Sequence, residues 1–216
     1  FWPNSPDRDE LKESESYVEW GEEQEDHNGK WSERSTVQSR KSWWWLGDRE
    51  ISELNVNYMI NQHMRFYYKE GGLAVSNNFH EIHAEPGLSK ELATVTNSTF
   101  QALLLNILGR SNFGGGLLKL ETYEAAELYT VDPRDVSDLE VPKKSLKNVA
   151  QKSLFEEIGL ERNRPIREQE PDPLPDRKEL DDIVFDALGL SEGERKEVYW
   201  SVAELVKARL DKAESV

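Results

Sequence analysis

One amphipathic segment, residues 98–109, constrains the fold most strongly. Apolar side chains recur there at the three- and four-residue spacing of one helix face, at Phe100, Leu103, Leu104, Ile107 and Leu108. Asn97 or Ser98 is suited to cap its start, and Gly109 is suited to end it. The pattern predicts one helix that buries this stripe in the core of a domain.

Strand patterns surround the expected helix. Alternation over residues 54–60 places Leu54, Val56, Tyr58 and Ile60 on one side of a strand. Residues 66–68 and 73–75 flank a Gly-Gly pair and predict a hairpin. Further strands are expected at 79–84, 117–120 and 128–131, with helical turns at 123–127. Residues 29–132 should therefore form an α+β domain that is β-rich around one core helix.

The C-terminal part changes character twice. Residues 133–176 are polar and interrupted by prolines, and only 149–158 have a helical pattern, so we expect a linker there. Two apolar stripes then follow, separated by Gly189 and by a capping box of Ser191 and Glu194. They consist of Leu180, Ile183, Val184, Ala187 and Leu188, and of Val198, Val202, Leu205 and Val206. They predict a helical hairpin over residues 177–216.

Composition excludes several classes of protein. Only 37% of the 216 residues are hydrophobic and none is cysteine, so disulfides and thiolate metal sites are excluded. No apolar run approaches the roughly 18 residues of a membrane helix. His80 and His83 would point to opposite faces of a strand, so no metal site is expected. The chain begins at Phe1, and we expect it to be part of a longer protein.

The charge is unevenly distributed. A net charge of −15 argues against nucleic acid, because phosphate binding needs cations. Residues 1–28, however, hold ten acids against Arg8 and Lys12, and they are expected to be a solvated segment. The stretch 29–47 has only Glu33 as an acid, and its cations are Lys30, Arg34, Arg40 and Lys41. The acidic excess thus lies largely outside this basic stretch.

Two motifs have both a functional and a structural interpretation. Trp43, Trp44 and Trp45 follow two cations, which suits base stacking, but tryptophans also fill small cores. Residues 109–116 combine a cation, small polar groups and glycines, which lets a backbone approach a ligand closely. The alternative is a turn that needs positive φ. The residues concerned are Arg110, Ser111, Asn112, Gly114, Gly115 and Gly116.

Taken together, these segments resemble the C-terminal region of the large adenine-N6 DNA methyltransferases of restriction–modification systems, including fused methylase–endonuclease enzymes. The matching stretches are YVEWGE at 17–22, SRKSWWWL at 39–46, VSNNF at 75–79, NSTFQ at 97–101, GRSNFGGG at 109–116, LKLETYE at 118–124 and LDDIVFDALGL at 180–190. Such regions look like target recognition domains, which hold double-stranded DNA and read its bases.

The resemblance implies a set of DNA contacts. Cations for phosphate are expected from Lys30, Arg34, Arg40, Lys41, Arg110 and Lys119. Aromatic, amide, hydroxyl and backbone contacts are expected from Trp43, Trp44, Asn77, Asn78, Ser111, Asn112, Gly114, Gly115 and Gly116. On this interpretation residues 29–132 are the recognition domain.

The resemblance also implies what lies elsewhere. The family's catalytic loop contains Pro-Pro, which this chain lacks, so no catalytic residue is assigned. S-Adenosylmethionine is expected to bind the N-terminal methyltransferase domain of the same protein, with no cofactor in this chain. The partners are then double-stranded DNA and that domain, with no membrane, in the cytoplasm. Two alternatives remain: a separate specificity subunit acting in trans, and an acidic protein–protein interaction domain that does not bind DNA.

Overall fold

Residues 5–48, 50–62, 64–136 and 152–215 are described by the structure, a computed structural model. The chain divides into two units, residues 1–51 and residues 52–216. Residues 29–51, which the sequence analysis assigned to the recognition domain, therefore pack with the acidic segment. The functional boundary at residue 28 stays a prediction.

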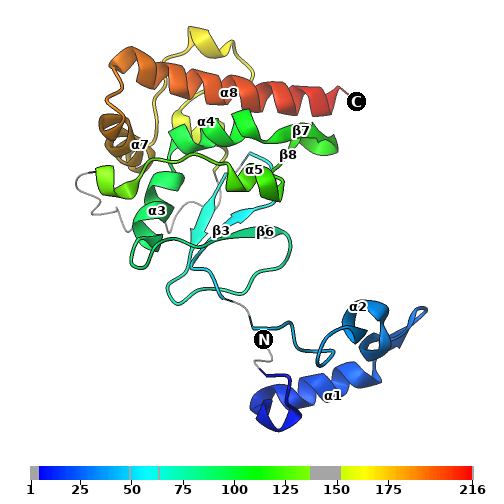
Figure 1. The fold of residues 1–216 in the computed structure, drawn as a ribbon. Helices are drawn as coiled ribbons and strands as arrows, with labels where there is room; N and C mark the ends of the chain where they lie inside the picture. The colour runs from blue at the N-terminus through cyan, green and yellow to red at the C-terminus, as the bar shows by residue number, and fades with distance from the viewer. Residues whose placement is uncertain (1–4, 49, 63, 137–151, 216) are drawn as a thin grey trace. The chain divides into compact units, whose positions relative to one another are not determined.

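The first unit is built from short elements (Figure 1). The longest helix among its described residues is α1, Glu15–Glu23, and a two-stranded antiparallel hairpin follows it. Leu11 and Val18 are buried, so the acidic segment is folded and not only solvated. The remaining elements are η1 (Arg8–Glu10), η2 (Lys12–Ser14), β1 (Glu25–Asp26), β2 (Gly29–Lys30), η3 (Trp31–Glu33) and α2 (Ser35–Gln38).

The described residues of the second unit form two small antiparallel sheets. One has the strand order β5-β3-β6 and the other the order β4-β8-β7. The strands of the first are β3 (Leu54–Asn57), β5 (Phe66–Tyr68) and β6 (Phe79–Ile82). Those of the second are β4 (Met59–Ile60), β7 (Arg110–Phe113) and β8 (Leu117–Lys119). The α+β class expected from the sequence is confirmed.

The strand expected over 54–60 is divided between the two sheets at Tyr58. The Tyr58 N–H donates to the Asn78 carbonyl at 2.8 Å, beside the first sheet. Its carbonyl accepts from the Leu120 N–H at 3.0 Å, just beyond the last strand residue of β8. The alternation of buried residues is real, but one extended segment serves two sheets.

The hairpin expected over 66–75 is wrong. β5 pairs with β3, and residues 73–75 form no strand. Gly71 and Gly72 have φ of 77° and 80°, and they turn the chain so that the Leu73 N–H donates to the Ser52 carbonyl. The strand expected at 128–131 is also absent, whereas the helical turns at 123–127 are confirmed by α5 (Thr122–Ala126).

Helices and strands share the core of the second unit. α4 (Thr99–Leu108) and α8 (Glu192–Glu214) lie along each other (Figure 1). Of the two residues expected to cap α4, Asn97 and Ser98, the structure has Ser98 at the cap. The expected capping box of α8 forms between Ser191 and Glu194. The other helical elements are α3 (Ser89–Thr96), η4 (Gly114–Gly116), η5 (Pro133–Asp135), α6 (Leu154–Ile158), η6 (Ile166–Glu168) and α7 (Pro175–Ala187).

The apolar stripe expected on α4 identifies the helix but not its buried face. Gln101, Ala102 and Leu105 are buried, whereas Ile107 is 62% exposed. Gln101 is accommodated because its amide donates to the Tyr129 carbonyl at 3.1 Å. The buried face of α4 is thus shifted from the expected stripe and includes a polar residue.

One apolar cluster joins most of the second unit. It unites strand residues such as Leu54 and Leu118 with α8 residues such as Val202 and Val206. The segment expected to be a linker contributes as well, through Leu154, Phe155, Ile158, Leu160 and Ile166. Of the helix expected at 149–158, residues 154–158 are helical and 149–151 lie outside the described residues. The C-terminal helical hairpin is confirmed as secondary structure and packs into the common core.

Candidate nucleic-acid interface

The sheet β4-β8-β7 aligns two of the expected DNA-contacting cations. Arg110 of β7 is directly opposite Lys119 of β8, and Lys119 is opposite Met59 of β4. Directly opposed residues of antiparallel strands share a face of the sheet. Met59, Lys119 and Arg110 therefore form a row across one face, and Met59 is 41% exposed.

Arg110 has an accessible guanidinium. Its Nε donates to Glu124 Oε1 at 2.6 Å, and the group lies 5.3 Å from the centre of the Tyr123 ring. The side chain is 53% exposed. Among the described residues none bonds to its two Nη atoms, which leaves a planar pair of donors. Such a pair suits a phosphate or the edge of a guanine.

Lys119 is more tightly held. Its Nζ lies 2.6 Å from Glu121 Oε1 and 4.9 Å from the centre of the Tyr58 ring, and the side chain is 18% exposed. The hydrogen bond to Glu121 raises the pKa of Lys119, and the same contact lowers the pKa of Glu121. The Tyr58 hydroxyl donates to Glu121 Oε2 at 3.1 Å. Lys119 is therefore a fixed, partly neutralised charge.

The Asn77–Asn78 turn lies next to this row. The Asn78 carbonyl accepts from the Tyr58 N–H at 2.8 Å, and both asparagines are exposed. His80, which follows, places one ring nitrogen 2.7 Å from the Leu120 carbonyl and packs edge-on against Tyr58. Tyr58 thus brings the turn and the Arg110–Lys119 pair into one neighbourhood.

The glycine turn has two different sides. Gly115 is exposed with φ of 73°, and a Cβ placed on it would have no neighbour within 4 Å. Gly116 has φ of 68°, and a Cβ there would lie 3.1 Å from the Leu210 side chain and 3.4 Å from that of Ala213. The close neighbour of this turn is therefore α8. Ser111 is exposed, whereas the side chain of Asn112 lies outside the described residues.

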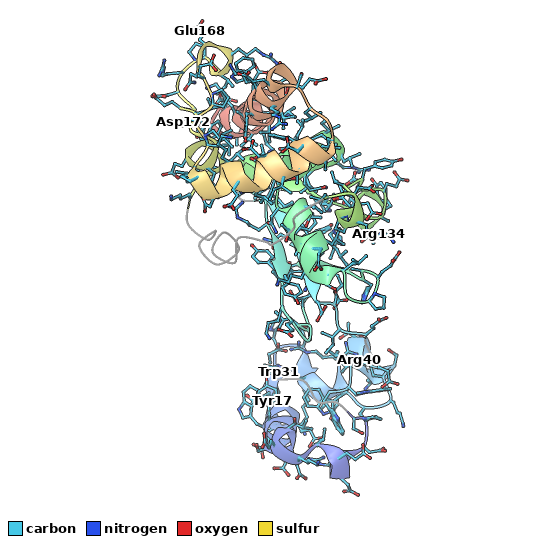
Figure 2. The ribbon with its side chains drawn as sticks, turned by 90° about the vertical axis from the view of Figure 1, so that its left-hand side faces the viewer. Tyr17, Trp31, Arg40, Arg134, Glu168 and Asp172 are labelled. Atoms are coloured by element: carbon cyan, nitrogen blue, oxygen red, sulfur yellow. The ribbon has the colours of Figure 1, made fainter. Side chains whose placement is uncertain are left out.

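The expected cations of the first unit are distributed differently. Arg34 is paired with Asp26 and lies 5.8 Å from the centre of the Trp31 ring. Arg40 donates to the Trp43 carbonyl at 3.5 Å, while Lys30 and Lys41 are exposed. Figure 2 shows Trp31 on one side of this unit and Arg40 on the other. The structure does not gather these four cations into one patch.

The tryptophans make contacts inside the first unit. Trp43 packs against Gly21 of α1, so a Cβ at Gly21 would clash with the indole ring. The Trp44 Nε1 donates to the Ser5 carbonyl at 3.1 Å. Both side chains are half-buried, and their rings meet edge to face. These contacts favour the core interpretation, and base stacking stays a prediction.

Sequence reasoning missed the residues that hold the cations in place. Tyr58, Tyr123, Glu121 and Glu124 are all absent from the expected contacts. The alternation of Lys119, Glu121 and Tyr123 could have indicated these contacts, because a short strand that leads into a helix places such side chains close together.

Within the described ranges, no group of three or more carboxylate or imidazole side chains is arranged to hold a metal ion.

Residues 1–166 match a known family model, the C-terminal domain of the type II methyltransferase M.Eco57I. The match covers more than half of the 216 residues. The chain belongs to this family. No curated protein and no solved structure gives a match.

All expected contact residues of this methyltransferase C-terminal domain, from Lys30 to Lys119, lie inside the matched region. α7 and α8 lie outside it, although α8 completes the core beneath the Arg110–Lys119 sheet. None of the helices in the described ranges combines the length and apolar character needed to cross a lipid bilayer.

Proposed function

We propose that this methyltransferase C-terminal domain binds double-stranded DNA as the target recognition part of an adenine-N6 DNA methyltransferase in a restriction–modification system. The observation that carries the proposal is the cross-strand pair of Arg110 and Lys119 beside the exposed Asn77–Asn78 turn. Arg110 presents an open pair of donors, and the two asparagines present amides. Restriction–modification would place the protein in the cytoplasm with its DNA.

The cations Arg110 and Lys119 suit contact with phosphate at short range, although the chain as a whole is negatively charged. With a net charge of −15, long-range attraction to DNA is absent. Glu121 and Glu124 hold Lys119 and Arg110 in fixed positions, and a phosphate would compete with these carboxylates for the cations. We therefore expect binding that is weak at physiological salt in the isolated chain and stronger when the catalytic domain adds its own contacts.

Methyl transfer itself belongs to the rest of the parent enzyme. The target adenine has to leave the base stack to reach the reaction centre, and the recognition part holds the duplex meanwhile. S-Adenosylmethionine would bind the N-terminal domain of the same protein, and isothermal titration of this chain with the cofactor should show no saturable site.

A salt titration tests DNA binding directly. We expect the anisotropy of a fluorescent duplex of about 30 base pairs to rise saturably with the full chain at low salt. Log affinity should fall linearly with log salt concentration, and Arg110→Ala should lower the slope by about one unit. Arg164→Ala, which removes an exposed cation whose one ion-pair partner among the described residues is Glu161, is the matched control. Absence of saturable binding at the lowest salt would overturn the proposal.

The first unit needs a separate test. The triple variant Arg34→Ala, Arg40→Ala, Lys41→Ala should lower the salt slope by about three units if all three residues contact phosphate. An unchanged slope would show that the basic stretch only balances the acids before it.

A second candidate function is favoured by the surface of α1. Tyr17 and Trp20 are 52% and 45% exposed, and their ring centres lie 5.3 Å apart with the planes tilted by 36°, on a helix that carries several acids. An exposed aromatic pair in acidic surroundings is suited to another protein and not to DNA. The variant Tyr17→Ser, Trp20→Ser should then leave DNA affinity unchanged and weaken association with the separately expressed remainder of the parent enzyme, measured by sedimentation velocity.

A further inference from the structure

Arg209 of α8 is a buried cation among neutral oxygens. Only 5% of the residue is exposed. Its Nη1 donates to the Gly116 carbonyl and lies 3.4 Å from the Ile60 carbonyl. Its Nη2 lies 2.9 Å from the Asn61 carbonyl and 3.5 Å from Asn106 Oδ1. Among the described residues no carboxylate pairs with it.

Burying Arg209 in this way costs desolvation free energy, so stability alone does not explain it. A buried charge normally has an opposite charge beside it, because desolvation outweighs neutral hydrogen bonds. Burial lowers the pKa of Arg209, and no carboxylate opposes that effect. The Nε of Arg209 also has no partner in the described structure. A purely apolar side chain would fill the same space with less loss of hydration.

The bonded carbonyls show what Arg209 does. Ile60 ends β4 and is opposite Leu118 of β8, while Gly116 immediately precedes β8. Arg209 therefore ties together the end of one strand and the start of its neighbour. Both strands belong to the sheet that carries Arg110 and Lys119.

The glycine turn rests on the same part of α8. A Cβ on Gly116 would lie 3.4 Å from the Arg209 carbonyl and 3.1 Å from the Leu210 side chain. A side chain at Gly116 would be strained by the positive φ and would force the Leu210 side chain to move by a few tenths of an ångström. Gly115, one residue earlier, faces open space. The turn is supported on its inner side and accessible on its outer side.

We propose that Arg209 is a positioning residue that fixes the glycine turn and the adjoining β4–β8 pair against α8, so that the Arg110–Lys119 row meets DNA in one arrangement. The DNA part rests on the proposed function, whereas the positioning part does not. α8 lies outside the region matched by the family model. The Arg110–Lys119 row, which lies inside the matched region, is thus supported by a helix that lies outside it.

The test compares three variants of this chain. Arg209→Met removes every hydrogen bond but keeps an apolar stem, and Arg209→Lys keeps the charge but replaces the planar guanidinium. Arg162→Met is the matched control, because Arg162 pairs with Asp211 and Glu214 in the same last turns of α8 but not with the glycine turn. Each variant is studied at a temperature where it is folded, by amide hydrogen exchange of Gly115 and Gly116 and by duplex anisotropy at low salt.

We expect Arg209→Met to speed exchange of these glycine amides at least tenfold and to weaken DNA binding at least fivefold. For both the exchange rate and the DNA affinity, Arg209→Lys should give values between those of Arg209→Met and wild type. Arg162→Met should change neither the exchange rate nor the affinity. Equal glycine exchange in Arg209→Met and wild type, or an equal effect of Arg162→Met, would overturn the inference. If wild type binds no DNA, the proposed function fails while the exchange comparison still decides the positioning role. If Arg209→Met does not fold, Arg209→Lys decides by the same exchange measurement.

Discussion

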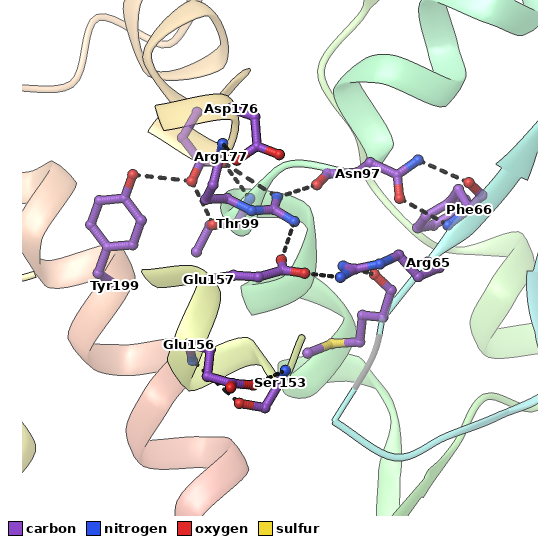
Figure 3. Close-up of polar contacts among 12 residues, drawn as sticks. Arg65, Phe66, Asn97, Thr99, Ser153, Glu156, Glu157, Asp176, Arg177 and Tyr199 are labelled. Atoms are coloured by element: carbon purple, nitrogen blue, oxygen red, sulfur yellow. Dashed lines mark hydrogen bonds and ion pairs between the residues drawn. The ribbon is translucent and has the colours of Figure 1, made fainter. Parts of the chain in front are cut away.

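Asp181 of α7 caps the start of α4 across 82 residues of sequence. Its carboxylate accepts from the Thr99 backbone N–H and from the Thr99 hydroxyl, each at 2.6 Å. The Tyr199 hydroxyl donates to it at 3.0 Å from α8. Asp181 is completely buried, and Figure 3 shows the polar network around Thr99, Arg177 and Tyr199 to which it belongs.

Asp181→Asn should destabilise the second unit strongly. It removes the negative charge near the buried Arg177 guanidinium and replaces one acceptor by a donor that faces Thr99 donors. Breaking one partner of a buried ionic network typically costs about 3–5 kcal/mol. Urea unfolding followed by circular dichroism measures the loss. Asp182→Asn, on the exposed side of the same helix, should cost less than about 1 kcal/mol, and equal losses would contradict the capping role.

Asp132 should titrate at unusually low pH. Hydrogen bonds from the Arg134 side chain and backbone N–H lower its pKa from 3.8 to about 2. Because the folded pKa lies below the unfolded value, the carboxylate stabilises the fold above pH 3.8, and that contribution is lost as pH falls through about 2. Carboxyl carbon NMR measures the pKa. Arg134→Met should raise it part of the way, since the backbone N–H remains, and an unshifted value in wild type would refute the pairing.

Gly115 and Gly116 should respond differently to alanine. Both have positive φ, which costs a residue with a Cβ about 1 kcal/mol or more. At Gly116 the added methyl also meets α8, whereas at Gly115 it meets nothing. Thermal unfolding should therefore show Gly116→Ala to be less stable than Gly115→Ala by about 1 kcal/mol. If Gly115→Ala is stable but fails to bind DNA, the outer side of the turn contacts DNA.

Gly21→Ala should disturb the first unit by displacing Trp43. The new methyl would overlap the indole ring that packs on α1. The indole N–H signal of Trp43 should shift or broaden in NMR spectra, while amide signals of α8 stay unchanged. Gly193→Ala is the control, because that helical glycine has no neighbour within 4 Å of an added Cβ. It should stabilise α8 by roughly 0.5–1 kcal/mol.

The sequence predicts the individual helices, strands and caps better than it predicts which of them pack or pair together. The helix after Ser98, the capping box at Ser191 and the strand at 117–120 depend on neighbouring residues, and all three are confirmed. The pairing of 66–68 with 73–75 depended on which strand lies beside which, and two positive-φ glycines redirect the chain there. The buried face of α4 depended on how closely α8 approaches, which periodicity does not encode.

At the candidate interface too, the sequence identified single residues but not which of them lie close together. Residue type, together with the family resemblance, identified Arg110, Lys119 and the two asparagines as candidates. Their proximity depends on the register of β7 with β8 and on Tyr58, which bonds to the asparagine turn and to the residue after β8. The carboxylates beside the cations were overlooked because they come from the short helix α5 and the residue before it. In the first unit Arg34 pairs with Asp26 and Arg40 donates to the Trp43 carbonyl, and a role of the basic stretch in DNA binding stays a prediction.

The long reach of α8 affects how the protein is made. Arg209 meets Ile60 across 149 residues, and the apolar face of α8 covers strands that leave the ribosome long before it. At elongation rates of about 5–20 residues per second, β3 and β4 wait on the order of ten seconds for that helix. During synthesis their apolar side chains are open to chaperones and to neighbouring nascent chains on the same messenger RNA. Translation speed through the residues between β4 and α8 therefore sets how long each new chain is vulnerable to aggregation.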